Sequence, residues 1–556
     1  MLTDKLKEII ETAAGNDSLV TLTRPQKQFG HFATNIAMKI AKKQGVNPRK
    51  VADKIAASII DNDMIVKAEV AGPGFINITI SDSVWLDELK RLLEDGITAK
   101  NPTYDGKVIV TEYSDPNPFK ELHIGHLYTT VIGDAISNLI KVGGGEVHKV
   151  NFGGDVGMHV AKAMWAIIKH LGGELPDKLT EVDEADRPAW LSARYVEGSS
   201  AFENSETFQV EIRDLNKRIY KVVTDKDHES DFAKIYWTCR QWSYDYFDSF
   251  YANLGTKFER YYPESENAAL GAETVKSHVG DVYSESDGAI VFVGEKHGLH
   301  TRVFINNQGL PTYEAKDIGL ALAKKRDYKF DKTVIITGND IAEYMKVVVK
   351  SLEQFEPELA KGTIHITHGQ VKMSGGVKMS SRLGNVLSAT DVIGAVRKLA
   401  QEQQPDSKVD SSIAAIKYGF LKQGIGPDVI FDAKESVSLE GKSGPYLQYA
   451  NARANSVLTK TTLTDEISND LETDESELLR KIAEYEDILR DAINELAPHK
   501  VALYLYDLAQ TFNRFYEKNR VIDDGRSSLR AQLVKAYQKI LQHGLKILNI
   551  ATPEKM

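Results

Sequence analysis

The sequence predicts an α/β protein built on a doubly wound parallel sheet. A helical insertion interrupts the sheet domain, an α+β domain precedes it and an α-helical bundle follows it. Three observations lead to this prediction: short apolar strands alternate with helical segments from residue 105 onward, apolar and polar residues alternate near residue 75, and helical periodicity dominates after residue 430. The 556 residues are enough for about three to five domains.

The α+β domain is expected over residues 1–104. Leu6 and Ile10 follow a helical period, and the basic segment 39–54 predicts two helices separated at Asn47-Pro48. Residues 75–80 alternate between apolar and polar side chains after a Gly-Pro-Gly turn, which predicts a strand.

The parallel-sheet domain is expected over residues 105–430. It begins with an apolar strand at 108–110, a proline-containing loop and a helix that runs to about Ile140. Further strands are predicted at 289–293, 302–306, 333–337 and 364–368. The charge-rich, mostly helical stretch at about 155–288 is interpreted as an insertion into this domain.

Helical periodicity then continues over residues 431–556, where an acidic stretch at 461–479 separates two helical blocks. We expect a helical bundle.

Composition excludes several classes of protein. Cys239 is the single cysteine, so an internal disulfide and a multi-cysteine zinc site are impossible. No apolar run approaches ~18 residues and no leader is recognisable, so a cytoplasmic protein without a membrane partner is expected. The net charge of −10 argues weakly against nucleic acid as a partner.

The strongest motif is the segment 116–126, Pro-Asn-Pro-Phe-Lys-Glu-Leu-His-Ile-Gly-His, which follows the first strand and opens the helix. The N-terminus of a helix attracts phosphate, Gly125 permits close approach of a nucleotide, and His123 and His126 add donors. The two histidines and the glycine could also meet by chance. Their position between strand and helix favours a phosphate site, to which Lys120 adds a cation.

A second motif, Gly-Gly-Val-Lys-Met-Ser-Ser-Arg at 375–382, follows the strand predicted at 364–368. Taken alone, it is typical of an ordinary basic surface loop. Paired with the histidine motif in one nucleotide-binding sheet, Lys378 and Arg382 can neutralise a departing pyrophosphate.

Together the two motifs resemble the HIGH and KMSKS signatures of the class I aminoacyl-tRNA synthetases. Segments 29–38, 70–77, 443–453 and 553–556 resemble the arginyl-tRNA synthetases in particular, so the resemblance spans nearly the whole chain. Two residues depart from the family pattern. Arg382 stands where the wider class has a second lysine, and Asp115 stands where the family commonly has serine, in a loop expected to tolerate the change.

The resemblance implies a Rossmann-type catalytic domain that activates arginine with ATP and transfers it to tRNA(Arg). Mg²⁺ is expected to accompany ATP, with no metal held by a protein motif and no zinc. The catalytic residues it implies are Lys120, His123, His126, Lys378 and Arg382. The ATP-binding residues it implies are Pro116, Asn117, His123, Gly125, His126, Met379 and Ser380.

An arginine site must bind a guanidinium group, which requires carboxylates and a flat stacking surface. Glu112 ends the first strand, and Tyr313 and Asp317 lie one helical turn apart on one face. The residues that match the family's arginine site are Glu112, Asn117, Tyr313, Asp317 and Asp340. A strand-end surface acid and a solvated helix face are the simpler alternatives.

For tRNA, aromatic and polar residues in the two outer domains can stack on unpaired bases or bond to them. The candidates are Phe75, Asn77, Tyr446, Gln448, Tyr449 and Arg453. Aromatic residues belong to a core as often as to a base-stacking surface. A monomer that does not bind DNA is expected. The family resemblance also implies that arginine activation requires bound tRNA.

Other functions stay open. A different class I synthetase or a related nucleotidylyltransferase would share the phosphate motifs but lack the acidic pocket. An inactive paralogue would bind tRNA only, although both motifs keep their functional groups. Dehydrogenases and P-loop enzymes are excluded, because the chain has neither Gly-x-Gly-x-x-Gly nor Gly-x-x-x-x-Gly-Lys-Ser/Thr.

Overall fold

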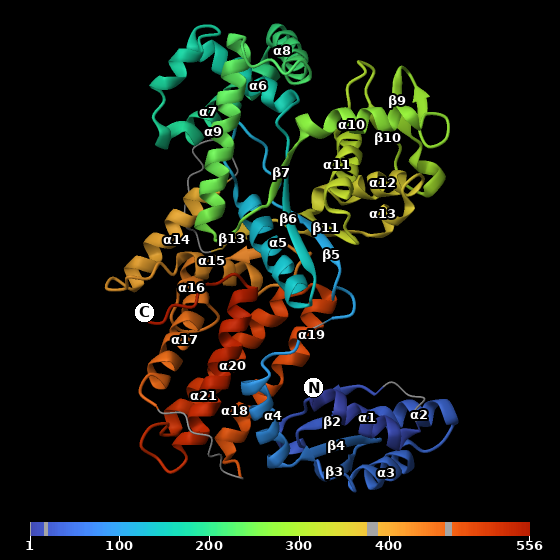
Figure 1. Cartoon of the computed structure of the whole chain (residues 1–556), viewed down its shortest axis with the longest axis vertical. Coiled ribbons are helices and arrows are strands. Elements are labelled where there is room, and N and C mark those ends of the chain that lie inside the picture. The colour runs from blue at the N-terminus through green and yellow to red at the C-terminus, as the bar shows by residue number, and fades with distance from the viewer. Residues whose placement is uncertain (1, 16–19, 100, 375–386, 462–469) are drawn as a thin grey trace.

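The computed structural model describes residues 2–15, 20–99, 101–374, 387–461 and 470–556. A central sheet lies between a C-terminal helical bundle on one side and two lobes on the other, and the N-terminal domain packs beside the bundle (Figure 1). All three parts of the predicted fold class are present, and their α+β, parallel-sheet and helical characters are confirmed.

The N-terminal domain is a four-stranded antiparallel sheet in the order β1-β2-β4-β3, covered by helices. The break predicted at Asn47-Pro48 is confirmed, since the Asn47 side chain accepts a hydrogen bond from the Arg49 N–H and Pro48 occupies the first helical turn. The elements are α1 (Leu2–Ala14), β1 (Leu22–Thr23), β2 (Phe32–Thr34), α2 (Ile36–Gln44), α3 (Pro48–Ile59), β3 (Ile65–Ala71), β4 (Phe75–Ile80) and α4 (Asp82–Glu94).

The central sheet has five parallel strands in the order β12-β11-β5-β6-β7. Its strands are β5 (Val108–Glu112), β6 (Glu146–Gly153), β7 (Arg260–Pro263), β11 (Lys332–Gly338) and β12 (Thr363–His368). The sequence did not predict β6, because the polar residues His148, Lys149 and Asn151 interrupt its apolar pattern. Two of these polar side chains are nevertheless accommodated: Lys149 pairs with Asp134, and Asn151 donates to the Tyr113 carbonyl.

Two predicted strands were assigned to the wrong sheet. β9 (Ala289–Phe292) and β10 (Arg302–Ile305) pair antiparallel, and with β8 (Ser284–Ser286) they form a separate three-stranded sheet. The connection between β9 and β10 is too short for the crossover of a dozen or more residues that a parallel pair requires.

The expected insertion at 155–288 is helical, but it is not continuous, because β7 returns to the central sheet. Before β7, four helices enclose their own apolar core, which includes Cys239. They are α6 (Met158–Leu171), α7 (Arg187–Asn204), α8 (Glu206–Thr224) and α9 (Asp231–Asn253). After β7, α10 (Glu264–Ser277) crosses α11 (Tyr313–Tyr328) closely, since a Cβ atom on Gly271 would lie 1.8 Å from the Ala315 carbonyl oxygen.

The remaining elements complete the central domain and form the C-terminal bundle. They are α5 (Ile124–Val142), α12 (Ala342–Glu353), α13 (Pro357–Lys361), β13 (Val371–Met373), α14 (Ala389–Gln403), α15 (Ser412–Leu421), β14 (Val429–Phe431), α16 (Ala433–Ser436), α17 (Gly444–Leu458), α18 (Thr473–Ala483), α19 (Tyr485–Glu495), α20 (Pro498–Lys518) and α21 (Ser527–Ile547). No helix in the described part of the chain has the length and apolarity needed to cross a membrane.

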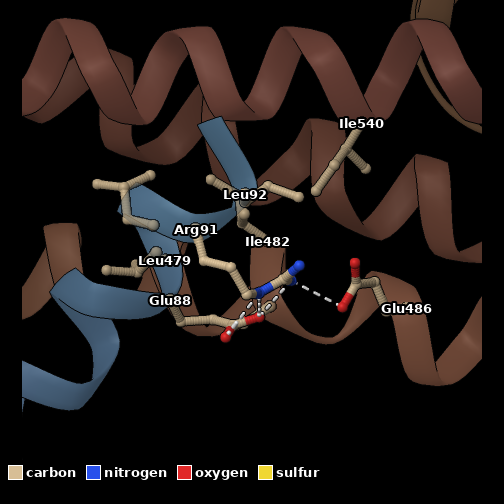
Figure 2. Close-up of a pocket in the computed structure, with 9 residues that line it drawn as sticks. Glu88, Arg91, Leu92, Leu479, Ile482, Glu486 and Ile540 are labelled. Atoms are coloured by element: carbon tan, nitrogen blue, oxygen red, sulfur yellow. Dashed lines mark hydrogen bonds and ion pairs between the residues drawn. The ribbon is translucent and has the colours of Figure 1, made fainter. Parts of the chain in front are cut away.

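The N-terminal domain is fixed to the bundle through α4. Arg91 on α4 donates to Glu88 at 2.6 Å and to Glu486 on α19 at 2.8 Å, and Leu92, Leu479, Ile482 and Ile540 pack around this triad (Figure 2). Glu486 also accepts a hydrogen bond from the backbone N–H of Thr98, so Arg91 and Thr98 both tie the N-terminal domain to the bundle.

Candidate active site

The candidate site lies at the carboxyl ends of β11, β5 and β6. In the sheet, β5 lies between β6, the next strand in the chain, and β11, so the strand order reverses at β5. Open α/β sheets bind ligands at such points of reversal. The loop from β5 to α5 carries the first predicted motif across this edge.

Three residues of this loop that are not glycine have left-handed backbone conformations: Ser114 at φ 76°, Asp115 at φ 47° and Phe119 at φ 68°. Hydrogen bonds from neighbouring elements hold the loop in this shape. The N–H of Phe152 donates to Asp115 Oδ1 at 2.8 Å, and the N–H of Gly154 donates to Asn117 Oδ1 at 3.1 Å. A strained backbone that several hydrogen bonds hold in place is typical of ligand-binding loops.

His123 and His126 lie together at the start of α5, with ring centroids 3.7 Å apart. Gly125 N–H donates to His123 Nδ1 at 3.0 Å, and His123 N–H donates to His126 Nδ1 at 3.1 Å. Burial lowers the pKa of His123 to about 4 and holds the pKa of His126 well below its usual value. Both rings are therefore neutral near pH 7, and because Nδ1 accepts in each, Nε2 carries the proton available to a phosphate.

Lys120 and Asp340 lie near the two histidines. Lys120 is largely desolvated, which lowers its pKa, and its positive charge contributes to the lowered pKa of both histidines. Its Nζ is 5.5 Å from the centroid of the Tyr195 ring. The carboxylate of Asp340, which the sequence resemblance matched to the arginine site, opposes the lowering of the pKa of His123 and His368 and so lies within electrostatic reach of both.

Lys378, Met379, Ser380 and Arg382, predicted from the second motif, lie outside the described residues. The segment that follows is anchored to the first motif. Ile124 N–H donates to the Leu387 carbonyl at 3.0 Å, and Ala389 N–H donates to the Leu122 carbonyl at 2.8 Å. The chain therefore resumes after the second motif in direct contact with the first.

The acids predicted for the arginine site lie on β5 and α11. Glu112, buried at the end of β5, pairs with Lys324 on α11. Asp317, two turns before Lys324 on the same helix, accepts a hydrogen bond from the hydroxyl of Tyr344. The Tyr313 ring is 56% exposed and offers an open stacking face one turn before Asp317.

Electrostatic interactions connect these carboxyl groups. Desolvation raises the pKa of Asp317 to about 7, with a contribution from Glu112, although the hydrogen bond from Tyr344 acts in the opposite direction. Desolvation raises the pKa of Asp115 well above its usual value, and the nearby Glu112 and Asp317 carboxyl groups add to this rise. The Phe152 N–H and Lys324 oppose it. Without a ligand, the charged forms of these carboxyl groups are therefore disfavoured, and a bound cation would favour their ionisation.

The residues predicted to bind tRNA lie in two separate regions. Phe75 begins β4 and is exposed, and Asn77 lies two residues further along the same strand. On α17, Tyr449 is exposed and the Arg453 guanidinium lies 5.0 Å from its ring centroid. Gln448 faces inward: it is 1% exposed and donates to the Ala551 carbonyl, so its side chain fixes the C-terminal segment.

The remaining predicted tRNA residue, Tyr446, accepts a hydrogen bond from Asn513 on α20 at 2.8 Å. Asn513 also accepts one from Arg453 at 2.9 Å. The Arg453 guanidinium also lies 5.8 Å from the ring centroid of the exposed Tyr516. Tyr449, Arg453 and Tyr516 thus form one aromatic and basic surface, here called the α17 surface.

Sequence reasoning missed several residues that hold the site. Lys324 and Tyr344 fix the two acids of the pocket, and no local motif marks either residue. Gly154 could have been found from the sequence, because it belongs to a Gly-Gly pair at the end of a strand. A Cβ atom at this position would lie 2.5 Å from Asn117 Oδ1, so the site requires glycine here. Among the described residues, no three His, Cys, Asp or Glu side chains form a potential metal site.

Family models match three parts of the chain. Residues 1–80 match the arginyl-tRNA synthetase N-terminal domain, residues 88–422 match the catalytic domain of class I tRNA synthetases (R), and residues 447–556 match the DALR anticodon-binding domain.

Relatives agree with these matches. An arginine–tRNA ligase of Porphyromonas gingivalis is 28% identical over 97% of this chain and 96% of its own length, and one of Phocaeicola vulgatus is 26% identical over 100% and 99%. The fold resembles those of the Thermus thermophilus and Plasmodium falciparum arginyl-tRNA synthetases, with TM-scores of 0.80 and 0.79 at 23% and 21% identity. The match covers the whole of this chain and at least 99% of each solved chain.

Proposed function

We propose a role for each residue of the site, on the premise that the chain belongs to the class I arginyl-tRNA synthetases and is an arginine–tRNA ligase that uses ATP. The observation that carries the proposal is the placement of two features at one sheet edge: a pair of neutral histidines at a helix N-terminus and a pocket of buried carboxylates. The first feature suits the phosphates of ATP and the second suits the guanidinium of arginine.

In the first step, the arginine carboxylate attacks the α-phosphorus of ATP and pyrophosphate leaves, which yields arginyl-adenylate. The His123 and His126 Nε2–H groups donate to phosphate oxygens, and Lys120 supplies positive charge beside them. Lys378 and Arg382 act on the departing pyrophosphate. Mg²⁺ bound to the ATP substrate would balance part of the phosphate charge. Catalysis by these residues consists of positioning and charge stabilisation.

The arginine side chain enters the acidic pocket. Asp317 forms the charged contact with the guanidinium, the exposed Tyr313 ring stacks on its face, and Glu112 completes the anionic wall while Lys324 holds it in place. Amino acids without a guanidinium leave these buried carboxylates unpaired. Discrimination of about 10⁴-fold is therefore available without an editing site.

In the second step, a hydroxyl of the terminal ribose of tRNA(Arg) attacks the activated carbonyl and AMP leaves. The α17 surface offers stacking faces and a cation to bases of the anticodon loop, and Phe75 offers an exposed ring to a second part of the tRNA. All proposed binding residues come from one chain, so the proposal requires only a monomer.

Aminoacylation assays with the twenty amino acids, ATP, Mg²⁺ and tRNA test the substrate assignment. Arginine should be charged at least 10⁴-fold more efficiently than any other amino acid. Preferential charging of another amino acid would refute the proposal.

Two variants separate the proposed roles. Asp317→Ala should mainly raise the KM for arginine, whereas His126→Ala should mainly slow adenylate formation. An equal loss of ATP affinity in both variants would contradict this division.

A further inference from the structure

The helical insertion holds the backbone on both sides of Lys120. Phe119 N–H donates to Ser243 Oγ on α9 at 2.9 Å, and Glu121 N–H donates to Ser192 Oγ on α7 at 2.6 Å. Both serines are buried, so these two hydrogen bonds are shielded from water. Two helices of the insertion therefore set the position of the turn that carries Lys120.

The conformation of Phe119 also depends on the insertion. Its backbone is left-handed at φ 68°, which is strained for a residue with a bulky side chain. The ring is fully buried in the apolar core of the insertion and stacks on Tyr236 of α9, with centroids 5.9 Å apart. Burial of the ring offsets the strain of the backbone, so the packing of the insertion stabilises this turn.

The side chain of Lys120 has an aromatic partner and no acidic one. Its Nζ lies 5.5 Å from the ring centroid of Tyr195, which follows Ser192 by one turn of α7. Among the described residues, no carboxylate forms an ion pair with Lys120, although desolvation makes an unpaired ammonium group costly. The face of an aromatic ring attracts a cation, so Tyr195 offsets part of that cost.

An aromatic partner preserves the charge that a carboxylate would cancel. A carboxylate beside Lys120 would neutralise the ammonium group and repel the phosphates of ATP, whereas an uncharged ring does neither. The charge of Lys120 is felt across the site, because it adds to desolvation in lowering the pKa of His123 and His126. A cation that is held in place and not neutralised suits the charge that develops on the phosphates.

We propose that Tyr195 is a positioning residue for adenylate formation: its ring holds the Lys120 ammonium group at the phosphate site, while Ser192 and Ser243 fix the turn that carries it. This inference rests on the proposed function, because it requires that Lys120 acts on the phosphates of ATP. The helical insertion thereby takes part in the first step of the reaction through the loop that it holds.

Pyrophosphate exchange at saturating arginine, ATP and tRNA tests this role. Tyr195→Leu keeps most of the bulk and removes the aromatic face, so the rate should fall about 3- to 30-fold. Tyr195→Phe keeps the face and should retain most of the rate. Lys120→Met should also be slow, and adding Tyr195→Leu to it should cause no further loss, because the two side chains act through one contact. Val196→Ala, at an exposed neighbour on α7, is the matched control and should leave the rate unchanged.

Four outcomes would overturn the proposal: an unimpaired Tyr195→Leu, an unimpaired Lys120→Met, equal losses in Tyr195→Phe and Tyr195→Leu, or a full further loss when Tyr195→Leu is added to Lys120→Met. Tyr195 also lies within electrostatic reach of Tyr313. Weaker arginine binding with an unchanged rate at saturation would therefore assign Tyr195 to the arginine site instead. If the unaltered protein forms no adenylate with arginine, the proposed function itself is wrong, so the two failures are distinguishable.

Discussion

At the scale of single residues, the site depends on protonation states that the fold imposes. The two histidines are kept neutral by burial, and their tautomer is fixed by backbone N–H groups that donate to Nδ1. Asp317 is kept near its titration point, because desolvation and the neighbouring acids disfavour its charge. The two halves of the site therefore respond differently to pH.

Arginine affinity should increase as the pH rises through about 7. The pKa of Asp317 in the empty site is about 7, so below this pH a bound proton must leave before the guanidinium can pair with the carboxylate. Affinity should rise by up to about tenfold per pH unit below 7 and level off above it. Asp115, whose pKa is also raised, acts in the same direction. Calorimetry between pH 5.5 and 8.5 measures this, and the dependence should become shallower in Asp317→Asn; an affinity that does not change with pH would contradict the assignment.

The histidines should act as neutral donors. His126→Gln can keep a side-chain N–H near the position of Nε2, whereas His126→Ala removes it. We expect Ala to slow adenylate formation by about 10²- to 10³-fold and Gln to slow it less, with arginine affinity unchanged in both. Pyrophosphate exchange in the presence of tRNA measures the rate. Equal defects in the two variants would mean that Nε2–H is not the functional group.

At the scale of secondary-structure elements, α17 combines two roles on different faces. Its inward residues Gln448 and Asn451 donate to the Ala551 and Pro553 carbonyls and so fix the C-terminal segment. Its outward residues Tyr449 and Arg453 join Tyr516 in the α17 surface. One helix therefore ties the end of the chain to the bundle and presents a surface suited to unpaired bases.

Tyr449→Ala should raise the KM for tRNA by about 5- to 100-fold, because loss of one stacked base costs about 1–3 kcal/mol. The KM for arginine and for ATP should not change. Steady-state aminoacylation provides all three values. Val210→Ala removes an exposed apolar side chain from α8, outside both proposed tRNA regions, and should leave the KM for tRNA unchanged. Unaltered tRNA use in Tyr449→Ala would remove the α17 surface from the proposed binding path.

At the scale of the whole molecule, buried polar contacts join the three domains. Asp134 on α5, 1% exposed, accepts hydrogen bonds from Tyr113 beside the active-site loop and from Asn549 after the last helix. Lys417 donates to the Leu254 and Asn549 carbonyls. At the other end of the bundle, Arg91 joins α4 to α19 (Figure 2). The relative placement of the domains thus depends on a few satisfied buried groups.

Arg91→Met should destabilise the contact between the N-terminal domain and the bundle. It leaves the buried Glu486 carboxylate without its cation, which costs about 1–3 kcal/mol. Thermal unfolding should begin at a lower temperature, and the double variant Arg91→Met/Glu486→Gln should recover part of the loss. Lys90→Met, which changes an exposed lysine on the same helix, is the control. Equal stability of Arg91→Met and Lys90→Met would show that the triad does not stabilise the interface.

The sequence by itself determined the features that depend on neighbouring residues. The strand, loop and helix that carry His123 and His126, the break before α3 and the helical character of the C-terminal domain follow from local periodicity and capping chemistry. The residue types of an arginine site could also be proposed from the sequence, because a guanidinium group requires acids and a flat ring. Local sequence did not reveal β6 or β7, since polar side chains occupy much of β6 and β7 has four residues.

Tertiary structure alone decided which groups meet. Glu112 and Lys324 are 212 residues apart in the chain, and Asp317 meets Tyr344 only because α11 and α12 pack together. Contact with the C-terminal segment turns Gln448 inward, and the fold brings Asp340 within electrostatic reach of His123. The contact partners of each site residue, its desolvation and its charge depend on long-range contacts between elements. Residue types and local spacing can therefore identify the reaction, but they cannot assign a proton or a partner to each side chain.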